Sequence, residues 1–248
     1  MISKLSSVKV ELIPIFENNY VFLIINTKNE AIIVDPGEAS LVIDIINIRG
    51  LLPVGILITH HHLDHIGGLE LLKRMYPVPI YAPLLNKSQI ILADHFVSEA
   101  DSELTIGSFK IKVIDLPGHT LGHIAYWFYE NKWLFSGDVL FGLGCGRLFE
   151  GSFQQMFESL QKIKTLPMET LIYCTHEYTA SNLNFCKISL KITNDKKLNR
   201  YETELLKLRN LSIPSVPLSL GIECTVNPFL TATSVDQFAQ IRKLRNNF

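Results

Sequence analysis

The sequence predicts an α/β protein whose last third is largely helical. In the first half, short apolar runs suited to β-strands alternate with segments whose apolar residues recur at helical spacing. From Tyr178 onward the pattern changes to long amphipathic segments that carry Lys and Arg: Ala180–Leu190, Leu198–Leu208 and Ser234–Leu244. A chain of 248 residues, 47% apolar and 19% charged, can fold around one large core or a core with a smaller appended unit.

The first half contains four strand-like runs and two helix-like segments. The predicted strands are rich in β-branched and aromatic residues and are Val8–Ile13, Tyr20–Ile25, Ala31–Val34 and Gly55–Thr59. The predicted helices are Ala39–Ile48 and Gly67–Tyr76. Each helix is followed closely by a residue that ends helices, Gly50 in the first case and Pro77 in the second.

A second β-rich block follows the first. Its predicted strands are Leu104–Ile114, Ile124–Tyr129 and Trp133–Phe135. The residues Glu130-Asn131-Lys132 between the last two strands fit a hairpin turn. A helix is then predicted over Phe153–Ile163, and one more strand, Thr170–Cys174, ends directly before Thr175-His176. The block therefore keeps the α/β character up to the point where the helical part begins.

Composition excludes several classes of protein. The net charge of −1 lacks the positive balance of a nucleic-acid-binding chain, so a small anionic ligand suits the basic C-terminal part better. The most apolar stretch, Leu41–Ile58, is interrupted by charged residues, Gly and Pro, so no membrane span is predicted. Met1–Ser7 carries no export signal. The four cysteines lack a C-x-x-C spacing, and we expect free thiols in the cytoplasm.

The segment Thr59–His65, with the sequence T-H-H-H-L-D-H, predicts a metal site. His60 and His62 follow a strand-like run and are two residues apart, so their side chains leave on the same side and can bind one ion. His61 is expected to point away. Asp64 and His65 follow where the chain must turn, so they can supply ligands to a second ion nearby. A surface patch of histidines without a metal is disfavoured, because it gives no reason for ligand-type residues to cluster in this way.

Two adjacent ions need more ligands than this segment supplies. The other candidates stand at predicted strand ends or in turns, and they are His119 after Pro117-Gly118, Asp138 after Ser136-Gly137, and His176. Each of them alone is more typical of an ordinary hydrogen-bonded polar residue than of a ligand. The predicted set is His60, His62 and His119 for one ion, and Asp64, His65 and His176 for the other, with Asp138 as the bridging carboxylate.

These motifs resemble the metallo-β-lactamase superfamily. The segment matches its T-H-x-H-x-D-H signature, and the later motifs keep its order: Gly118-His119-Thr120, Ser136-Gly137-Asp138 and Cys174-Thr175-His176. The match covers residues 8–177. The resemblance implies an αββα sandwich of two mixed β-sheets with helices outside and metals at one edge. His123 and Asp35 are candidates to support ligand imidazoles and are left out of the catalytic set.

Within the superfamily the chain resembles the glyoxalase II, or hydroxyacylglutathione hydrolase, family as far as its last residue. The residues that carry this likeness are Ile13–Tyr20, Leu143–Arg147, Glu150-Gly151, His176–Thr179, Asn227–Phe229 and Arg242–Phe248. The resemblance implies that the glutathione moiety is bound by Arg147, Phe149, Tyr178, Arg242 and Arg245. Family members often have Lys in place of Arg147, Tyr in place of Phe149 and Arg in place of Thr231. Phe149 therefore lacks a hydroxyl that can touch the substrate.

The resemblance also implies a division of labour and a reaction. Residues 1–177 would form the catalytic domain and residues 178–248 a helical domain that binds glutathione. The reaction would be hydrolysis of S-(2-hydroxyacyl)glutathione thioesters, such as S-D-lactoylglutathione, the second step of methylglyoxal detoxification. Two divalent ions, Zn with Fe or Mn as alternatives, would activate a bridging hydroxide as the nucleophile, with Asp64 and Asp138 among the ions' ligands. A monomer with no membrane or nucleic-acid partner is expected.

Three other functions remain open from the sequence. A mononuclear-iron persulfide dioxygenase on the same fold would not need Asp64, His65 and His176 as ligands of a second ion, whereas Arg242 and Arg245 favour the hydrolase. A nuclease would require a larger basic surface and an added nucleic-acid domain. A non-catalytic metal-binding protein is disfavoured because all seven candidate ligands are present.

Overall fold

A computed structural model describes residues 8–101 and 103–248. The chain divides into two compact units, the first comprising residues up to 114 with 124–131, and the second comprising residues 115–123 and 132–248. The expectation about an export signal falls on residues 1–7, which lie outside the described residues. Among the described residues, no helix is long and apolar enough to cross a membrane.

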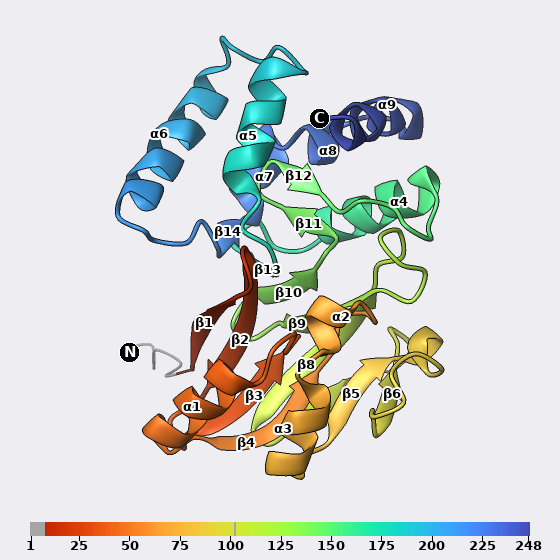
Figure 1. Cartoon of the computed structure of the whole chain (residues 1–248). Coiled ribbons are helices and arrows are strands. Elements are labelled where there is room, and N and C mark those ends of the chain that lie inside the picture. Colours follow the sequence, from red (N-terminus) through yellow and green to blue (C-terminus); the bar gives the residue numbers. More distant parts are fainter. Residues whose placement is uncertain (1–7, 102) are drawn as a thin grey trace, which may run out of the picture. The chain divides into compact units, whose positions relative to one another are not determined.

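The first unit is built on a six-stranded mixed sheet (Figure 1). Its strands follow chain order, β1 (Lys9–Ile15), β2 (Asn19–Ile25), β3 (Glu30–Val34), β4 (Leu52–Leu57), β5 (Ile80–Pro83) and β6 (His95–Val97). The first three strands pair antiparallel, whereas β3 to β6 pair parallel. Because parallel strands need crossover connections, helices link β3 to β4 and β4 to β5. These helices are α1 (Ser40–Arg49), α2 (Leu63–Ile66) and α3 (Leu69–Met75).

Two of these helices cover one face of the first sheet. Val42 and Ile46 of α1, and Leu69 and Leu72 of α3, are buried in one apolar cluster with alternate residues of β1 to β5. The intervening residues, such as Phe22 and Ile32, are also fully buried. The sheet is therefore covered on both faces, which is why its inner strands are continuous apolar runs rather than alternating ones.

A second six-stranded mixed sheet has the order β14-β13-β10-β9-β8-β7. Its strands are β7 (Leu104–Ile106), β8 (Phe109–Asp115), β9 (Ile124–Phe128), β10 (Trp133–Gly137), β13 (Leu171–Cys174) and β14 (Leu218–Ser219). In the second unit β10 and β13 pair parallel, with Gly137 opposite Cys174. The short strands β11 (Leu140–Phe141) and β12 (Gly144–Cys145) form a separate hairpin.

The second unit also contains the helical C-terminal part. Its helices are α4 (Phe153–Lys164), α5 (Thr179–Ile188), α6 (Lys196–Asn210), α7 (Leu220–Val226), α8 (Pro228–Thr231) and α9 (Val235–Asn246). Helices α8 and α9 pack against α4. The fully buried ring of Phe229 on α8 contacts the buried rings of Phe238 on α9 and Phe185 on α5. Side-chain caps fix several helix starts, as at Ser152 for α4 and Asp195 for α6.

The sequence predicts most of these elements within a few residues. Two differences matter for function. The helix expected to begin at Gly67 begins at Leu69, and the residues before it form the four-residue helix α2, which contains Asp64 and His65. The last helix extends to Asn246, beyond the predicted end at Leu244, so Arg242 and Arg245 both lie on it. The fold class is confirmed: two mixed sheets are followed by a helical C-terminal region.

Candidate active site

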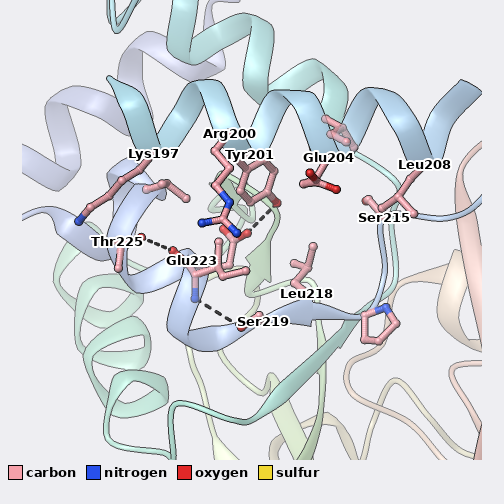
Figure 2. Close-up of a pocket in the computed structure, with 14 residues that line it drawn as sticks. Lys197, Arg200, Tyr201, Glu204, Leu208, Ser215, Leu218, Ser219, Glu223 and Thr225 are labelled. Atoms are coloured by element: carbon pink, nitrogen blue, oxygen red, sulfur yellow. Dashed lines mark hydrogen bonds between the residues drawn. The ribbon is translucent and has the colours of Figure 1, made fainter. Parts of the chain in front are cut away.

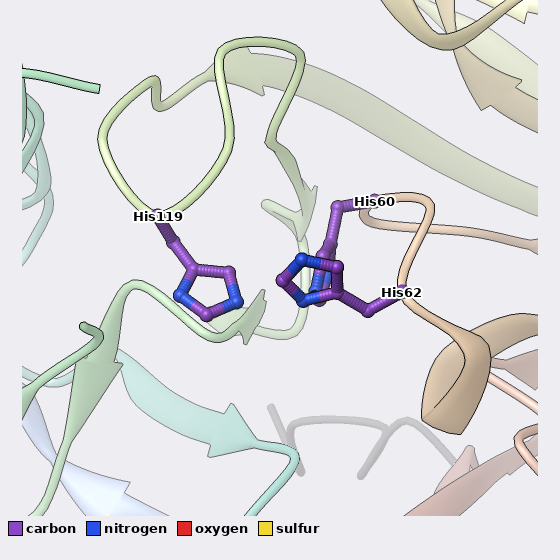
Figure 3. Close-up of side chains that lie close together, drawn as sticks. All are labelled: His60, His62 and His119. Atoms are coloured by element: carbon purple, nitrogen blue, oxygen red, sulfur yellow. Dashed lines mark hydrogen bonds between the residues drawn. The ribbon is translucent and has the colours of Figure 1, made fainter. Parts of the chain in front are cut away.

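The first group of predicted ligands lies just beyond the carboxyl end of β4. Thr59 and His60 are fully buried, and His62 immediately precedes α2. His60 Nε2 lies 3.0 Å from His62 Nδ1. Figure 3 shows the two rings together at the loop that follows the strand. Two imidazole nitrogens that converge on one point fit a shared cation, whereas His61 turns away and its Nδ1 accepts from Asn86 at 3.0 Å.

Asp35 organises this group from the neighbouring strand. β3 and β4 are parallel, with Val34 opposite Leu57, so Asp35 and Thr59 emerge at the same sheet edge. The buried Asp35 carboxylate accepts from the Thr59 backbone at 2.8 Å and from the Thr59 hydroxyl at 2.7 Å. It also accepts from His65 Nδ1 at 2.9 Å. Because the carboxylate binds one ring nitrogen, the other, His65 Nε2, is the candidate ligand atom.

Asp64 and His65 are placed by the short helix α2. His65 is buried and Asp64 is partly exposed, and His65 Nε2 lies 3.7 Å from Asp64 Oδ2. Asn19 of β2 donates to Asp64 Oδ2 at 2.9 Å and so restricts the carboxylate. The chain at Gly37 passes directly against α2, and a Cβ there would collide with the Asp64 backbone oxygen. The first unit therefore holds His60, His62, Asp64 and His65 as one preorganised group.

The second group lies at the ends of β10 and β13. Because these strands are parallel, Asp138 and His176 leave the sheet at the same edge. Asp138 Oδ2 lies 3.2 Å from His176 Nε2 and 3.4 Å from His119 Nε2, and all three residues are buried. Gly146 passes close by, since a Cβ on it would collide with the Asp138 backbone oxygen. One carboxylate thus lies between two imidazoles, and the bridging role of Asp138 stays a prediction.

Backbone contacts fix the orientation of this group. His119 Nδ1 donates to the Arg147 carbonyl at 2.6 Å, which makes Nε2 the candidate ligand nitrogen. His123, which the sequence suggests as a support for His119, instead accepts from the Asp138 backbone N–H at 3.1 Å through Nε2. His123 thus supports the loop that carries Asp138.

The predicted substrate-binding residues line a cleft in the second unit. It encloses about 230 Å³ and is lined by Phe141, Cys145, Arg147, Tyr178, Asn182, Arg242, Arg245, Asn246 and Phe248. The cleft thus brings together four of the five residues that the resemblance implies, and three of them are arginines. The three guanidinium groups make it a cationic site. Such a site suits the carboxylates of a small ligand.

The arginines of the cleft differ in their surroundings. Arg242 is buried, donates from Nη1 to the Cys145 carbonyl at 2.7 Å, and lies over the Phe229 ring. Arg245 is half-buried and donates from Nε to Asn182 Oδ1 at 3.0 Å. Burial, and secondly the charge of Arg242, lowers the pKa of the Arg245 guanidinium. Two guanidinium groups forced together in this way are stabilised by an anion between them.

Aromatic rings border the cleft and the second ligand group. The Tyr178 ring stacks on His176 with ring centroids 4.7 Å apart and contacts the edge of Phe141. Phe149 does not line the cleft. Its exposed ring lies against His119, with centroids 5.2 Å apart, and under the Arg147 guanidinium. Asn182 takes part in these contacts without any sequence signal that singles it out, because its partner Arg245 is distant in the chain. Asn19 and Cys145 lie within the segments Ile13–Tyr20 and Leu143–Arg147 that carry the family resemblance.

Comparisons with known proteins agree with this architecture. The family model described as the metallo-β-lactamase superfamily matches residues 15–176, and the one described as the hydroxyacylglutathione hydrolase C-terminus matches residues 177–248. The hydroxyacylglutathione hydrolase of Bdellovibrio bacteriovorus is 55% identical over 244 residues, which cover 96% of this chain and 97% of that protein. That of Methylobacillus flagellatus is 43% identical over 255 residues, covering 96% and 99%.

Solved structures show the same fold. The crystal structure of the BLEG-1 B3 metallo-β-lactamase superposes with a TM-score of 0.69 and 26% identity, covering 90% of this chain and all (100%) of that one. ETHE1 from Myxococcus xanthus gives a TM-score of 0.72 at 23% identity, covering 96% and 91%, and shows the fold alone.

Fold and ligand groups together define an α/β protein of the metallo-β-lactamase superfamily. The helical C-terminal part narrows this assignment, since it matches the family-specific C-terminus and the full-length relatives carry both parts. The chain belongs to the hydroxyacylglutathione hydrolase family.

Proposed function

We propose that the protein hydrolyses S-(2-hydroxyacyl)glutathione thioesters, with S-D-lactoylglutathione as the substrate and glutathione and D-lactate as the products. The cleft with three arginines carries this proposal, because glutathione presents two carboxylates. The family supports it, since the full-length relatives are hydroxyacylglutathione hydrolases. The substrate assignment thus rests on the helical part of the chain as much as on the ligand groups.

The two ligand groups would together hold two divalent ions. One ion would be bound by His60, His62 and His119, and the other by Asp64, His65 and His176, with Asp138 between them. In support, His60 Nε2 and His62 Nδ1 lie 3.0 Å apart in the first unit, and Asp138 Oδ2 lies 3.4 Å from His119 Nε2 and 3.2 Å from His176 Nε2 in the second. Imidazole and carboxylate donors fit Zn, and they also accept Fe and Mn.

The chain's own residues would perform orienting and binding steps. Bound divalent ions would supply a water of lowered pKa and a Lewis acid for the thioester carbonyl. Asp35 and the Arg147 carbonyl hold His65 and His119 in one tautomer, so neither of these two imidazoles needs to reorient when ions bind. Arg242, Arg245 and Arg147 would bind the glutathione carboxylates and so place the thioester beside the ligand groups. The leaving thiol has a pKa of about 8.5 and needs little acid assistance.

The remaining assignments are part of the same proposal. Residues 1–177 would form the catalytic domain and residues 178–248 the glutathione-binding domain. The reaction would be the second step of methylglyoxal detoxification, carried out by a monomer. The four free cysteines fit a reducing compartment, and we place the protein in the cytoplasm.

The test is hydrolysis of S-D-lactoylglutathione by the purified protein. The release of the thiol measures the reaction, and the metal content of the same sample is determined. We expect turnover at a content of two ions per chain, loss of turnover after chelation, and recovery with Zn. Protein that carries two ions per chain but releases no thiol would refute the proposal. Oxygen consumption with glutathione persulfide by a protein carrying a single iron would favour the dioxygenase instead.

A further inference from the structure

Glu223 of α7 is a buried carboxylate. It is far along the chain from the residues of both ligand groups. It is only 1% exposed, and no ion pair of the described residues includes it. Three neutral donors satisfy it: Tyr201 at 2.7 Å, the Leu143 backbone N–H at 2.8 Å and Asn227 Nδ2 at 3.0 Å. Figure 2 shows Glu223 and Tyr201 in the wall of an open groove between α6 and α7. Burying a carboxylate without a cation is costly, so its position requires an explanation.

The carboxylate acts on the turn between β11 and β12. Leu143 lies in this turn with φ +55°, a left-handed conformation that is unfavourable for a residue other than glycine. Glu223 accepts from the N–H of this residue. Asn227, itself bonded to Glu223, donates to the carbonyls of Phe141 at 3.0 Å and Gly144 at 3.1 Å. The turn is therefore held in a conformation that Leu143 alone disfavours.

The hairpin that this turn closes forms part of the candidate glutathione cleft. Phe141 and Cys145 line the cleft at the two ends of the hairpin. The Cys145 carbonyl accepts from Arg242, and Phe141 contacts the ring of Tyr178. Glu223 does not line the cleft, and its hydrogen bonds go to Tyr201, Leu143 and Asn227 instead. Its bond to Leu143 connects it to the cleft through the hairpin.

We propose that Glu223 is a positioning residue of the glutathione cleft. Its carboxylate fixes the β11–β12 turn and thereby holds Cys145 and the Arg242 guanidinium in the geometry that binds the glutathione moiety. This inference rests on the proposed function. It assigns a role in substrate recognition to a residue that lies 80 positions from the turn it holds.

The test compares the full-length, metal-loaded protein with its Glu223→Ala and Glu223→Asp variants. For both we expect KM for S-D-lactoylglutathione to rise about tenfold, equivalent to about 1.4 kcal/mol, with kcat within about twofold. KM for a lactoyl thioester of N-acetylcysteamine, which lacks the carboxylates, should not change. Glu223→Gln can keep its oxygen towards Leu143 and Asn227 while Tyr201 rotates to accept, so it should restore KM.

Matched measurements make each outcome decisive. Glu204→Ala removes an exposed carboxylate from the same groove and should leave both substrates unaffected. Equal KM changes for the two thioesters, or an unchanged KM in a folded Glu223→Ala protein, would overturn the proposal. Failure of both Glu223→Ala and Glu223→Asp to fold, with Glu223→Gln normal, would assign the residue to stability alone. Absence of lactoylglutathione hydrolysis by the wild-type protein would instead refute the proposed function.

Discussion

Replacing Arg242 by Ala should affect both stability and substrate binding, whereas replacing Arg245 should affect mainly binding. Both arginines lie on α9, and the sequence does not distinguish them. Arg242 is buried, donates to the Cys145 carbonyl and lies 5.3 Å from the Phe229 ring centroid. Arg245 is half-buried and donates to Asn182 Oδ1 and to the hydroxyl of the exposed residue Ser181.

The expected magnitudes follow from these contacts. A hydrogen bond from a charged donor contributes about 1.5–3 kcal/mol, and a desolvated cation–π contact adds up to about 2 kcal/mol. Because the two are not additive, we expect Arg242→Ala to lower the free energy of unfolding by about 3 kcal/mol. For Arg245→Ala we expect about 1 kcal/mol, because solvent can replace part of its bonding. Both should raise KM for S-D-lactoylglutathione by roughly tenfold or more.

The assay is urea unfolding at fixed metal content, combined with KM for lactoylglutathione and for a thioester without glutathione. Lys243→Ala is the matched control, because Lys243 is an exposed cation on the same helix whose recorded contact is with the Phe153 ring. Its KM and unfolding free energy should stay close to those of the wild type. Equal stability losses for Arg242→Ala and Arg245→Ala would contradict the reasoning from burial. Equal KM changes for both thioesters would mean that the arginines do not bind glutathione.

Three further results are expected. The Asp138→Ala variant should lose bound metal and, with it, at least about 100-fold in kcat, because the Asp138 carboxylate faces both His119 and His176. Metal analysis and kinetics on the same sample check this. Full metal content with full activity would exclude a bridging role. Asp35→Asn should weaken metal binding by about 10–100-fold, because His65 loses its carboxylate partner, and competition with a chelator measures the change. Burial raises the pKa of the Cys145 thiol to about 11, so this thiol stays protonated at pH 8. It should therefore react slowly with a disulfide reagent in the native protein. Rapid labelling would show that the cleft opens.

The sequence predicts the ligand residues well because they follow local rules. His60 and His62 stand after a strand, and Asp138 and His176 follow two strands that prove to be parallel neighbours. The short helix α2 was not predicted, since four residues carry no helical periodicity. The strands β5 and β6 were missed for the same reason, since runs of four and three residues carry no clear strand periodicity, and β5 also contains Pro83.

The contacts that hold the site cannot be predicted from a single sequence. The bonds of Glu223 to Leu143 and of Asn182 to Arg245 join residues that are 80 and 63 positions apart. No local pattern distinguishes these side chains from other polar residues of a helix. The role implied for Phe149 in substrate binding stays a prediction, and the structure places its ring against His119 rather than in the cleft.

The position of α9 has a practical consequence for handling the protein. Phe248 itself lines the cleft, and Arg242 and Arg245 lie within the last seven residues of the printed sequence. A purification tag fused after Phe248 would emerge at the mouth of the cleft, and a stop codon before Arg242 would remove both guanidinium groups. Fusions are therefore better made at the other end of the chain, and kinetic comparisons between preparations should first establish that their C-termini are the same.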